Sequence, residues 1–118
     1  MKREWAPDAG DLVWLTFDPQ AGREQAGREQ AGRRPALVLS REPYNRKSGL
    51  ALVCPITSHV KGYPFEVKLP PGLAVSGVIL ADHLKSADWR GRRAERAGHV
   101  AVLVLQEVLD RLAPLLGY

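Results

Sequence analysis

The segment Asp11 to Phe17, with the sequence DLVWLTF, decides which class of fold the chain adopts. In an extended backbone successive side chains point to opposite sides, so Leu12 and Trp14 share one side and Val13 and Leu15 share the other. Both sides are apolar, which predicts a strand that is buried on much of both faces. The fold therefore has a β core with other elements packed on each side of this strand.

Four further segments have the length and composition of strands, and turn signals separate them. They are Pro35 to Ser40, Leu50 to Ile56, Pro64 to Leu69 and Val75 to Asp82. The polar residues Tyr44 to Gly49 predict a turn that joins the first two in a hairpin, and Trp89 to Glu95 is either another strand or a bent edge. Short strands with intervening turns predict a small antiparallel barrel rather than a fold of parallel βαβ units.

The hydrophobic pattern changes to a helical period near the C-terminus. Apolar residues recur three or four positions apart, at Leu105, Val108, Leu109, Leu112, Leu115 and Leu116. They predict one amphipathic helix over about residues 103 to 114, whose regular part ends or kinks near Ala113 because Pro114 removes a helical hydrogen bond. The apolar run Val100 to Leu105 is equally compatible with the core and with a subunit interface.

The length and composition predict one domain over residues 1 to 118. The formal net charge is +4, and most basic residues are arginines, whose planar guanidinium suits phosphates and bases, although this charge alone is weak support for nucleic-acid binding. Cys54 is the only cysteine and lies in an apolar run, so we expect a buried core residue and no internal disulfide. No apolar run approaches the length of a membrane span, so we expect a cytoplasmic protein without membrane contact.

A five-residue unit, AGREQ, is repeated from Ala21 and then altered to AGRRP, which ends at Pro35. Its three glycines each cost about 1 kcal/mol in a helix, and a period of five builds no apolar face. We therefore expect a mobile lid loop over about residues 19 to 34, with a plain solvated insertion as the alternative. Pro35 biases Arg34 to an extended backbone at the start of a buried strand.

Several segments, in order along nearly the whole chain, resemble the MazF/PemK family of toxin endoribonucleases. They are Gly10 to Trp14 with Phe17 to Pro19, Glu29 to Gly32 with Arg34 to Ala36 and Val38 to Ser40, Pro55 to Thr57, Lys61 to Val67, and Ala81-Asp82 with Lys85-Ser86 and Trp89-Arg90. The resemblance implies an SH3-like barrel of the toxin type, a homodimer, and inhibition by a cognate antitoxin. It also implies metal-independent cleavage of single-stranded RNA at short sequence motifs.

Cleavage of RNA without a metal uses the 2′-hydroxyl of the substrate, so orientation and charge stabilisation supply much of the catalysis. The resemblance makes Arg34, Thr57 and Glu29 the catalytic candidates. Arg34 suits a phosphate clamp, because an arginine side chain stays charged in proteins and is a poor group for proton transfer. The Thr57 hydroxyl suits donation to a phosphate oxygen, and Glu29 suits acceptance of the 2′-hydroxyl proton. Without the resemblance, a strand-end threonine is usually structural and a loop glutamate is usually solvated.

The repeat leaves two registers open for the catalytic glutamate. The family usually has one Glu-Gln-Ala-Gly unit before the Arg-Pro step, whereas this chain has one starting at Glu24 and another at Glu29. We favour Glu29, because it keeps the family's distance to Arg34. His83 is a second departure, since close relatives often carry glutamine there.

The candidates for RNA binding include basic, polar and aromatic residues. They are Gln30, Arg33, Ser58, Lys61, His83, Lys85, Trp89, Arg90 and Arg92. Trp89 either stacks on a base or belongs to the core or an interface. His59 and His99 lack metal-ligand spacing with each other, with His83 or with Cys54, and no phosphate-binding glycine loop is present, so we expect no metal and no cofactor.

Three functions are compatible with these features. The first is the endoribonuclease toxin, whose antitoxin would place an acidic, flexible tail in the positively charged RNA groove. The second is a non-catalytic toxin of the same fold that acts on DNA gyrase, and the third is a nucleic-acid-binding barrel. Arg34 and Thr57 occurring together favour the first.

Overall fold

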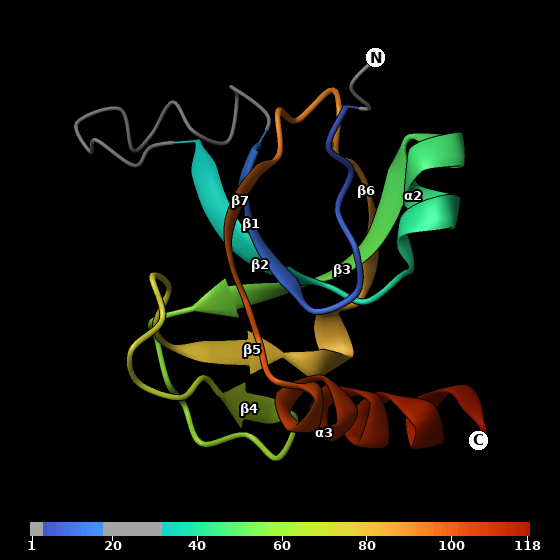
Figure 1. The fold of residues 1–118 in the computed structure, drawn as a ribbon. Coiled ribbons are helices and arrows are strands. Elements are labelled where there is room, and N and C mark those ends of the chain that lie inside the picture. Colours follow the sequence, from blue (N-terminus) through green and yellow to red (C-terminus); the bar gives the residue numbers. More distant parts are fainter. Residues whose placement is uncertain (1–3, 18–31) are drawn as a thin grey trace.

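The computed structural model describes residues 4 to 17 and 32 to 118. In this part of the chain seven antiparallel strands form one bent sheet (Figure 1). They are β1 (Asp11–Thr16), β2 (Arg33–Val38), β3 (Leu50–Thr57), β4 (Glu66–Lys68), β5 (Val78–Leu80), β6 (Lys85–Asp88) and β7 (Glu95–His99). The strand order is β4-β5-β3-β2-β1-β7, and β6 pairs with the first half of β3. The helices are α2 (Glu42–Ser48) and α3 (Val102–Leu112), with 3₁₀ turns η1 (Ala81–His83) and η2 (Ala113–Leu116).

The sheet confirms the predicted mainly β fold with a C-terminal helix. The predicted barrel is met only loosely, because the sheet is not closed. Within the described residues β4 and β7 are the two ends of the strand order and do not pair with each other. The strands nevertheless wrap around two separate hydrophobic clusters.

Adjacent residues of the central strands belong to different clusters, as the alternation in the sequence predicts. The first cluster lies against α3 and includes Leu12, Leu37, Cys54, Ile79 and Val108. The second cluster lies on the other side and includes Val13, Leu15, Ala36, Val38, Ala51, Val53, Ala87 and Trp89. Each fully buried Leu or Val contributes about 1.5–3 kcal/mol, so two-sided burial holds β1 and β2 at the centre.

Cys54 occupies the first cluster with no exposed surface, which confirms the predicted core position. Its Sγ donates to the Ala81 carbonyl oxygen at 3.7 Å. Burial and, secondarily, the nearby charge of Asp82 raise the pKa of the Cys54 thiol to about 12. The thiol therefore stays protonated at neutral pH and acts as a packing group.

The C-terminal helix α3 packs through Val108 and Leu112, which are buried. It ends at Leu112, and Pro114 lies in η2, so the regular helix stops where the proline predicts. The apolar run Val100 to Leu105, for which the sequence left both a core and an interface position open, is partly buried and partly exposed. Val100 is buried in the first cluster, whereas Val102 and Leu103 are 77% and 80% exposed.

The predicted polar turn between β2 and β3 is wrong, because these residues form helix α2 (Figure 1). The two strands are antiparallel neighbours as expected, but seven helical residues connect them. Arg41 at the N-cap makes no side-chain cap, and the Asp8 carboxylate instead accepts from the Glu42 N–H at 2.8 Å. Burial raises the pKa of Asp8, but backbone N–H donors of Glu42 and Ala9 together with Arg41 outweigh it, so the net shift is downward.

In the segment from Trp89 to Glu95, residues 89 to 93 form a turn rather than a strand, and the Arg92 N–H donates to the Asp88 carbonyl oxygen. The strand on its C-terminal side, β7, begins only at Glu95, and β6 was not predicted.

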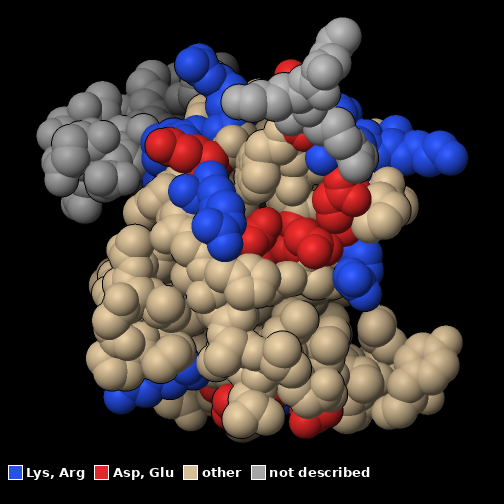
Figure 2. Space-filling model, in the orientation of Figure 1, with Lys and Arg blue, Asp and Glu red and all other residues tan. Residues whose placement is uncertain are grey.

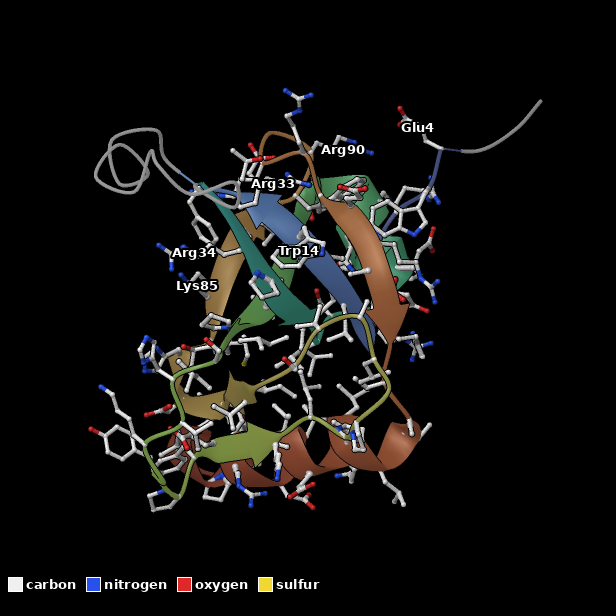
Figure 3. The ribbon with its side chains drawn as sticks, turned by 90° about the vertical axis from the view of Figure 1, so that its left-hand side faces the viewer. Glu4, Trp14, Arg33, Arg34, Lys85 and Arg90 are labelled. Carbon is white, nitrogen blue, oxygen red and sulfur yellow. The ribbon has the colours of Figure 1, made fainter. Side chains whose placement is uncertain are left out.

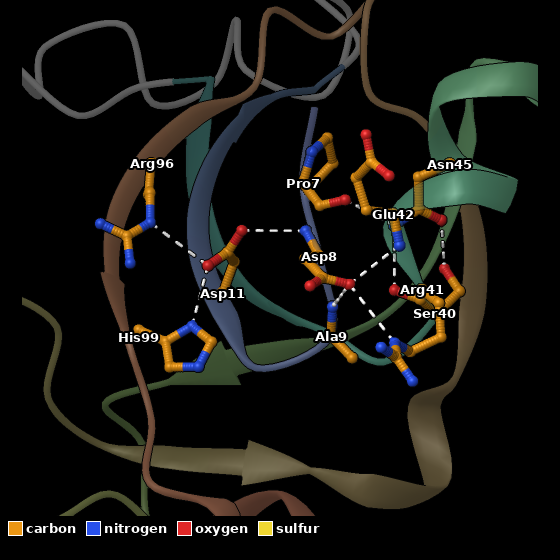
Figure 4. Close-up of polar contacts among 10 residues, drawn as sticks. All are labelled: Pro7, Asp8, Ala9, Asp11, Ser40, Arg41, Glu42, Asn45, Arg96 and His99. Atoms are coloured by element: carbon orange, nitrogen blue, oxygen red, sulfur yellow. Dashed lines mark hydrogen bonds and ion pairs between the residues drawn. The ribbon is translucent and has the colours of Figure 1, made fainter. Parts of the chain in front are cut away.

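Asp11 ties β1 to β7 in a buried position, since one of its carboxylate oxygens lies 2.9 Å from His99 Nδ1 and 3.2 Å from Arg96 Nε (Figure 4).

Asn45 is the buried polar residue that joins α2 to its surroundings (Figure 4). Its amide donates to the carbonyl oxygens of Pro7 at 2.8 Å and Ser40 at 2.9 Å, and its side-chain oxygen accepts from the Ser40 hydroxyl. The backbone carbonyl of Asn45 accepts from the Trp89 indole N–H at 2.8 Å. The bonds to Pro7 and Ser40 require the Asn45 side chain, whereas the bond from Trp89 is made to the backbone.

Replacing Asn45 by alanine is expected to lower the free energy of unfolding by about 2–4 kcal/mol, because buried carbonyl groups lose their donors. Chemical denaturation followed by tryptophan fluorescence measures this change. Lys47→Ala, at an exposed position of the same helix, is the control. An Asn45→Ala protein within about 0.5 kcal/mol of that control would contradict the assignment of Asn45 as a structural hub.

Candidate functional site

The register of β2 against β3 brings two candidate side chains to the same place. The ladder pairs Ala36 with Pro55, Leu37 with Cys54 and Val38 with Val53. Arg34 on β2 and Thr57 on β3 come two residues beyond the Ala36–Pro55 pair, where this ladder ends. Continuing the same register by two residues places them opposite each other. Directly opposite residues of antiparallel strands point to the same face.

That face is the one of the second hydrophobic cluster, because Arg34 is two residues from Ala36 and pairs with Leu15 on β1. Lys85 joins the same face from the other side of β3, since it pairs with Val53. Figure 3 shows Arg34 and Lys85 beside each other at one edge of the sheet, away from Arg33 and Arg90. We call Arg34, together with Lys85 and Arg92, whose cations lie over the Phe17 ring, the basic rim.

Phe17 organises the basic rim. The Lys85 ammonium and the Arg92 guanidinium each lie 5.3 Å from the centre of its ring. Arg92 also donates to the Thr16 carbonyl oxygen at 3.1 Å. A cation over an aromatic face is stabilised by about 0.5–2 kcal/mol without losing its charge, so both cations keep their capacity to attract an anion.

The Thr57 hydroxyl is oriented by its own loop. Its oxygen accepts a hydrogen bond from the His59 backbone N–H at 3.1 Å. A hydroxyl has one proton and two lone pairs, so this contact occupies a lone pair and leaves the proton for donation to another acceptor.

Gly77 packs directly against the backbone of Thr57. A methyl group at Gly77 would lie 2.2 Å from the Thr57 carbonyl oxygen and 3.2 Å from Ser58 Cα. The φ of Gly77 is +119°, which side-chain-bearing residues rarely adopt. Glycine at this position is therefore the condition for the observed position of Thr57.

Arg33 points to the opposite face from Arg34, as neighbours in a strand do. It donates to the Thr16 hydroxyl at 2.6 Å and to the Arg93 carbonyl at 3.0 Å, and pairs with Glu95 at 3.0 Å. These residues line a cavity of about 350 Å³. These contacts give Arg33 a structural role between β1, β2 and β7, and its RNA contact stays a prediction.

The predicted stacking residue Trp89 is 6% exposed and belongs to the second cluster, so of its two interpretations the structure supports the core. Its ring lies edge-on to Trp5 with centroids 6.0 Å apart. Arg90 covers the same ring at 4.6 Å and donates to the Arg46 carbonyl, which places it at α2 and not at the basic rim.

Other predicted residues lie on the exposed segments next to the rim. Ser58 and Lys61 are exposed in the loop after β3, and His83 is exposed on η1, 3.8 Å from Asp82. Glu29, Gln30 and the alternative Glu24 lie outside the described residues.

Two residues that shape the site were not predicted, namely Phe17 and Gly77. The two-residue spacing from Leu15 to Phe17 could have placed Phe17 on the same face as Leu15. Nothing in the sequence around Gly77 indicates its contact with Thr57, apart from its being a glycine beside a strand.

Charge is unevenly distributed over the face seen in Figure 1. Figure 2 shows charged side chains gathered over its upper part, whereas the lower part over β4 and β5 is mostly uncharged. Within residues 4 to 17 and 32 to 118, no three His, Cys, Asp or Glu side chains are grouped so that they could hold a metal ion. In that same part of the chain no helix has the length and apolar character needed to cross a bilayer.

Comparison with known proteins gives one consistent result. Residues 8–116 match the family model described as PemK-like, MazF-like toxin of type II toxin-antitoxin system. The endoribonuclease toxin MazF of Escherichia coli (strain K12) is 47% identical over 117 residues, which cover 99% of this chain and 100% of the relative.

Two solved structures are similar over nearly their whole length. The crystal structure of MazF (Form-I) from Deinococcus radiodurans is 57% identical, with a TM-score of 0.84 and coverage of 98% of this chain and 100% of that chain. The MazE-MazF (Form-III) crystal structure from the same organism is also 57% identical, with a TM-score of 0.85 and coverage of 96% and 98%.

Gly77→Ala is expected to displace Thr57, and Gly72→Ala is the matched control. Gly72 also has a positive φ, +94°, but nothing lies within 4 Å of the position of its added methyl group. Both variants carry backbone strain of about 1–2 kcal/mol, and only Gly77→Ala adds a clash worth about 1–3 kcal/mol more. Thermal denaturation and amide NMR shifts measure the two effects. Equal destabilisation, with unmoved Thr57 and Ser58 amide signals in both variants, would contradict the packing described.

Proposed function

Because the chain belongs to the family of PemK-like, MazF-like toxins of type II toxin-antitoxin systems, we propose that it is an endoribonuclease toxin that cleaves single-stranded mRNA at short sequence motifs without a metal ion. The observation that supports this proposal is the β2–β3 register, which, continued two residues beyond the Ala36–Pro55 pair, puts Arg34 opposite Thr57 on the face of the basic rim. One phosphodiester would be held between the two side chains.

Cleavage begins when the ribose 2′-hydroxyl loses its proton and attacks the adjacent phosphorus. Negative charge grows on the non-bridging oxygens, and the 5′-oxygen leaves with a proton. The Arg34 guanidinium donates hydrogen bonds to those oxygens. The Thr57 hydroxyl, whose oxygen already accepts from the His59 N–H, donates a hydrogen bond to one of them. The products carry a 2′,3′-cyclic phosphate and a 5′-hydroxyl. Glu29 remains our proposal for the residue that accepts the 2′-hydroxyl proton.

The other charges of the rim suit the phosphates on either side of the scissile one. Lys85 and Arg92 are fixed over Phe17 and need little reorganisation to meet a phosphate. Lys61, Ser58 and His83 extend the contact along the neighbouring exposed segments.

The positive charge of the RNA groove also favours an acidic protein partner. Solved relatives include a MazE-MazF complex, and we propose a cognate antitoxin whose acidic, flexible tail occupies the RNA groove of this chain. We also propose a homodimer, supported by exposed apolar side chains on α3 and η2, namely Val102, Leu103, Leu115 and Leu116.

Arg34→Ala and Thr57→Val are each expected to lower kcat/KM for RNA cleavage by on the order of 100-fold or more, the usual loss when one transition-state donor is removed. The assay uses single-stranded RNA in EDTA and identifies the chemical ends of the fragments. Arg41→Ala removes an exposed arginine near α2 and is the control, which should cleave like the wild type.

The outcomes separate the three functions. Fragments with cyclic phosphate ends that disappear in both variants support the proposal. RNA that is bound but never cut would favour a nucleic-acid-binding protein, and intact RNA with inhibited gyrase would favour the second type of toxin. Either result for the wild type contradicts the proposed chemistry.

The repeated unit yields a separate prediction about the glutamate. Deleting Ala21 to Gln25 restores the usual spacing and is expected to leave cleavage largely intact, whereas Glu29→Gln lowers kcat by about 10²- to 10⁴-fold, the usual range for a general base. Glu24→Gln is the matched control. If the deletion abolishes cleavage and Glu29→Gln does not, the register of the glutamate is wrong.

A further inference from the structure

Burial of Trp89 leaves the base-stacking function without a residue. The exposed aromatic side chains among the described residues are Trp5, Tyr44, Tyr63 and Tyr118. Trp5 lies against Trp89, Tyr44 lies on α2, and Tyr118 ends the chain. Only Tyr63, 58% exposed, lies on the segment that leads away from Thr57, residues 58 to 65.

This segment is held at its beginning by Thr57, since the His59 N–H donates to the Thr57 hydroxyl oxygen. In Figure 3 it leaves β3 below Arg34 and Lys85 and runs down the same side of the molecule. Tyr63 lies six positions after Thr57, a stretch that spans at most about 20 Å when extended, so both can contact one short RNA.

The backbone around Tyr63 is fixed, although its ring is exposed. Pro64 restricts Tyr63 to an extended conformation, and the Glu66 N–H donates to the Tyr63 carbonyl oxygen at 3.1 Å. The next carbonyl, that of Pro64, accepts from Arg111 Nε on α3 at 3.0 Å.

The Glu66 carboxylate holds the residues before Tyr63. One oxygen accepts from the Lys61 N–H at 3.0 Å and the other from the Gly62 N–H at 2.9 Å. Lys61 then places its ammonium 5.8 Å from the centre of the Tyr63 ring. Gly62 has a φ of +85° with open space around it, so this turn is held by the carboxylate and not by packing.

An exposed ring on a fixed backbone adds little to folding, because its apolar surface stays in water. It loses little entropy on binding, because its backbone is already ordered. A cation beside the ring also favours the phosphates on either side of a stacked base.

We propose that Tyr63 stacks on a base of the substrate RNA near the scissile phosphate, with Lys61 on an adjacent phosphate, and that Glu66 is the positioning residue for both. The inference rests on the proposed ribonuclease function and adds a base contact to it. Stacking does not select one base strongly, so Tyr63 contributes affinity and register along the RNA.

The test is a set of RNA substrates with an abasic nucleotide at each position in turn around the cleavage site. For the wild type, removing the base that contacts Tyr63 is expected to lower kcat/KM by about 5- to 150-fold, the range that corresponds to one stacked base. Tyr63→Ala should lose a similar factor on intact RNA and lose nothing further when that one base is absent. Tyr63→Phe should behave like the wild type.

Tyr44→Ala, which removes an exposed tyrosine from α2, is the matched control and should remain sensitive to every abasic position as the wild type is. Glu66→Gln keeps the shape of the side chain but turns one acceptor into a donor facing an N–H. It is expected to speed hydrogen exchange of the Lys61 and Gly62 amides and to weaken the dependence of cleavage on the same base.

Different results would contradict the ribonuclease function, the stacking contact of Tyr63 and the role of Glu66. A wild type that cuts no RNA overturns the proposed function. A wild type that cuts RNA, with Tyr63→Ala equally sensitive to every abasic position, overturns the stacking contact alone. Unchanged amide exchange in Glu66→Gln, or exchange that rises without any change in base dependence, overturns the positioning role of Glu66.

Discussion

The antiparallel register of β2 against β3 is the constraint on which the site depends. It is fixed by two-sided burial, since Leu37 and Val38 enter different hydrophobic clusters and both are fully buried. A slip by one residue would exchange the faces of the whole strand and put the side chain of Arg33 where that of Arg34 lies. The hydrophobic core therefore sets the position of a guanidinium on the surface.

The fold also determines where the charged side chains around Arg34 lie. Lys85 and Arg92 come from distant parts of the chain and meet over Phe17, an uncharged ring that leaves both cations active toward anions. Arg33, in contrast, is neutralised by Glu95 on the other face. The three cations Arg34, Lys85 and Arg92 thus share one face of the sheet, where they attract a polyanion such as RNA or an acidic tail.

Much of the fold could be predicted from the sequence, because periodicity reports burial directly. The alternation from Asp11 to Phe17 gave a strand buried on both faces, and Pro114 marked the end of α3. Helix α2 could not be predicted, because a seven-residue polar helix has no apolar stripe and is capped by a residue far away in sequence. Trp89 was ambiguous because a tryptophan suits a core and a stacked base equally. The approach of Gly77 to Thr57 depends on how β5 packs on β3, which local sequence does not encode.

Cleavage as proposed requires Arg34 and Thr57 to hold one phosphodiester between them. A crystal structure of the protein with an RNA oligonucleotide that carries a 2′-deoxyribose at the cleavage position tests it most directly, because such a substrate binds and is not cut. In that complex we expect the Arg34 guanidinium and the Thr57 hydroxyl to lie within about 2.7–3.2 Å of oxygens of the same phosphate. Contacts of the two side chains with different phosphates, or an RNA bound away from the Arg34 face, would contradict it.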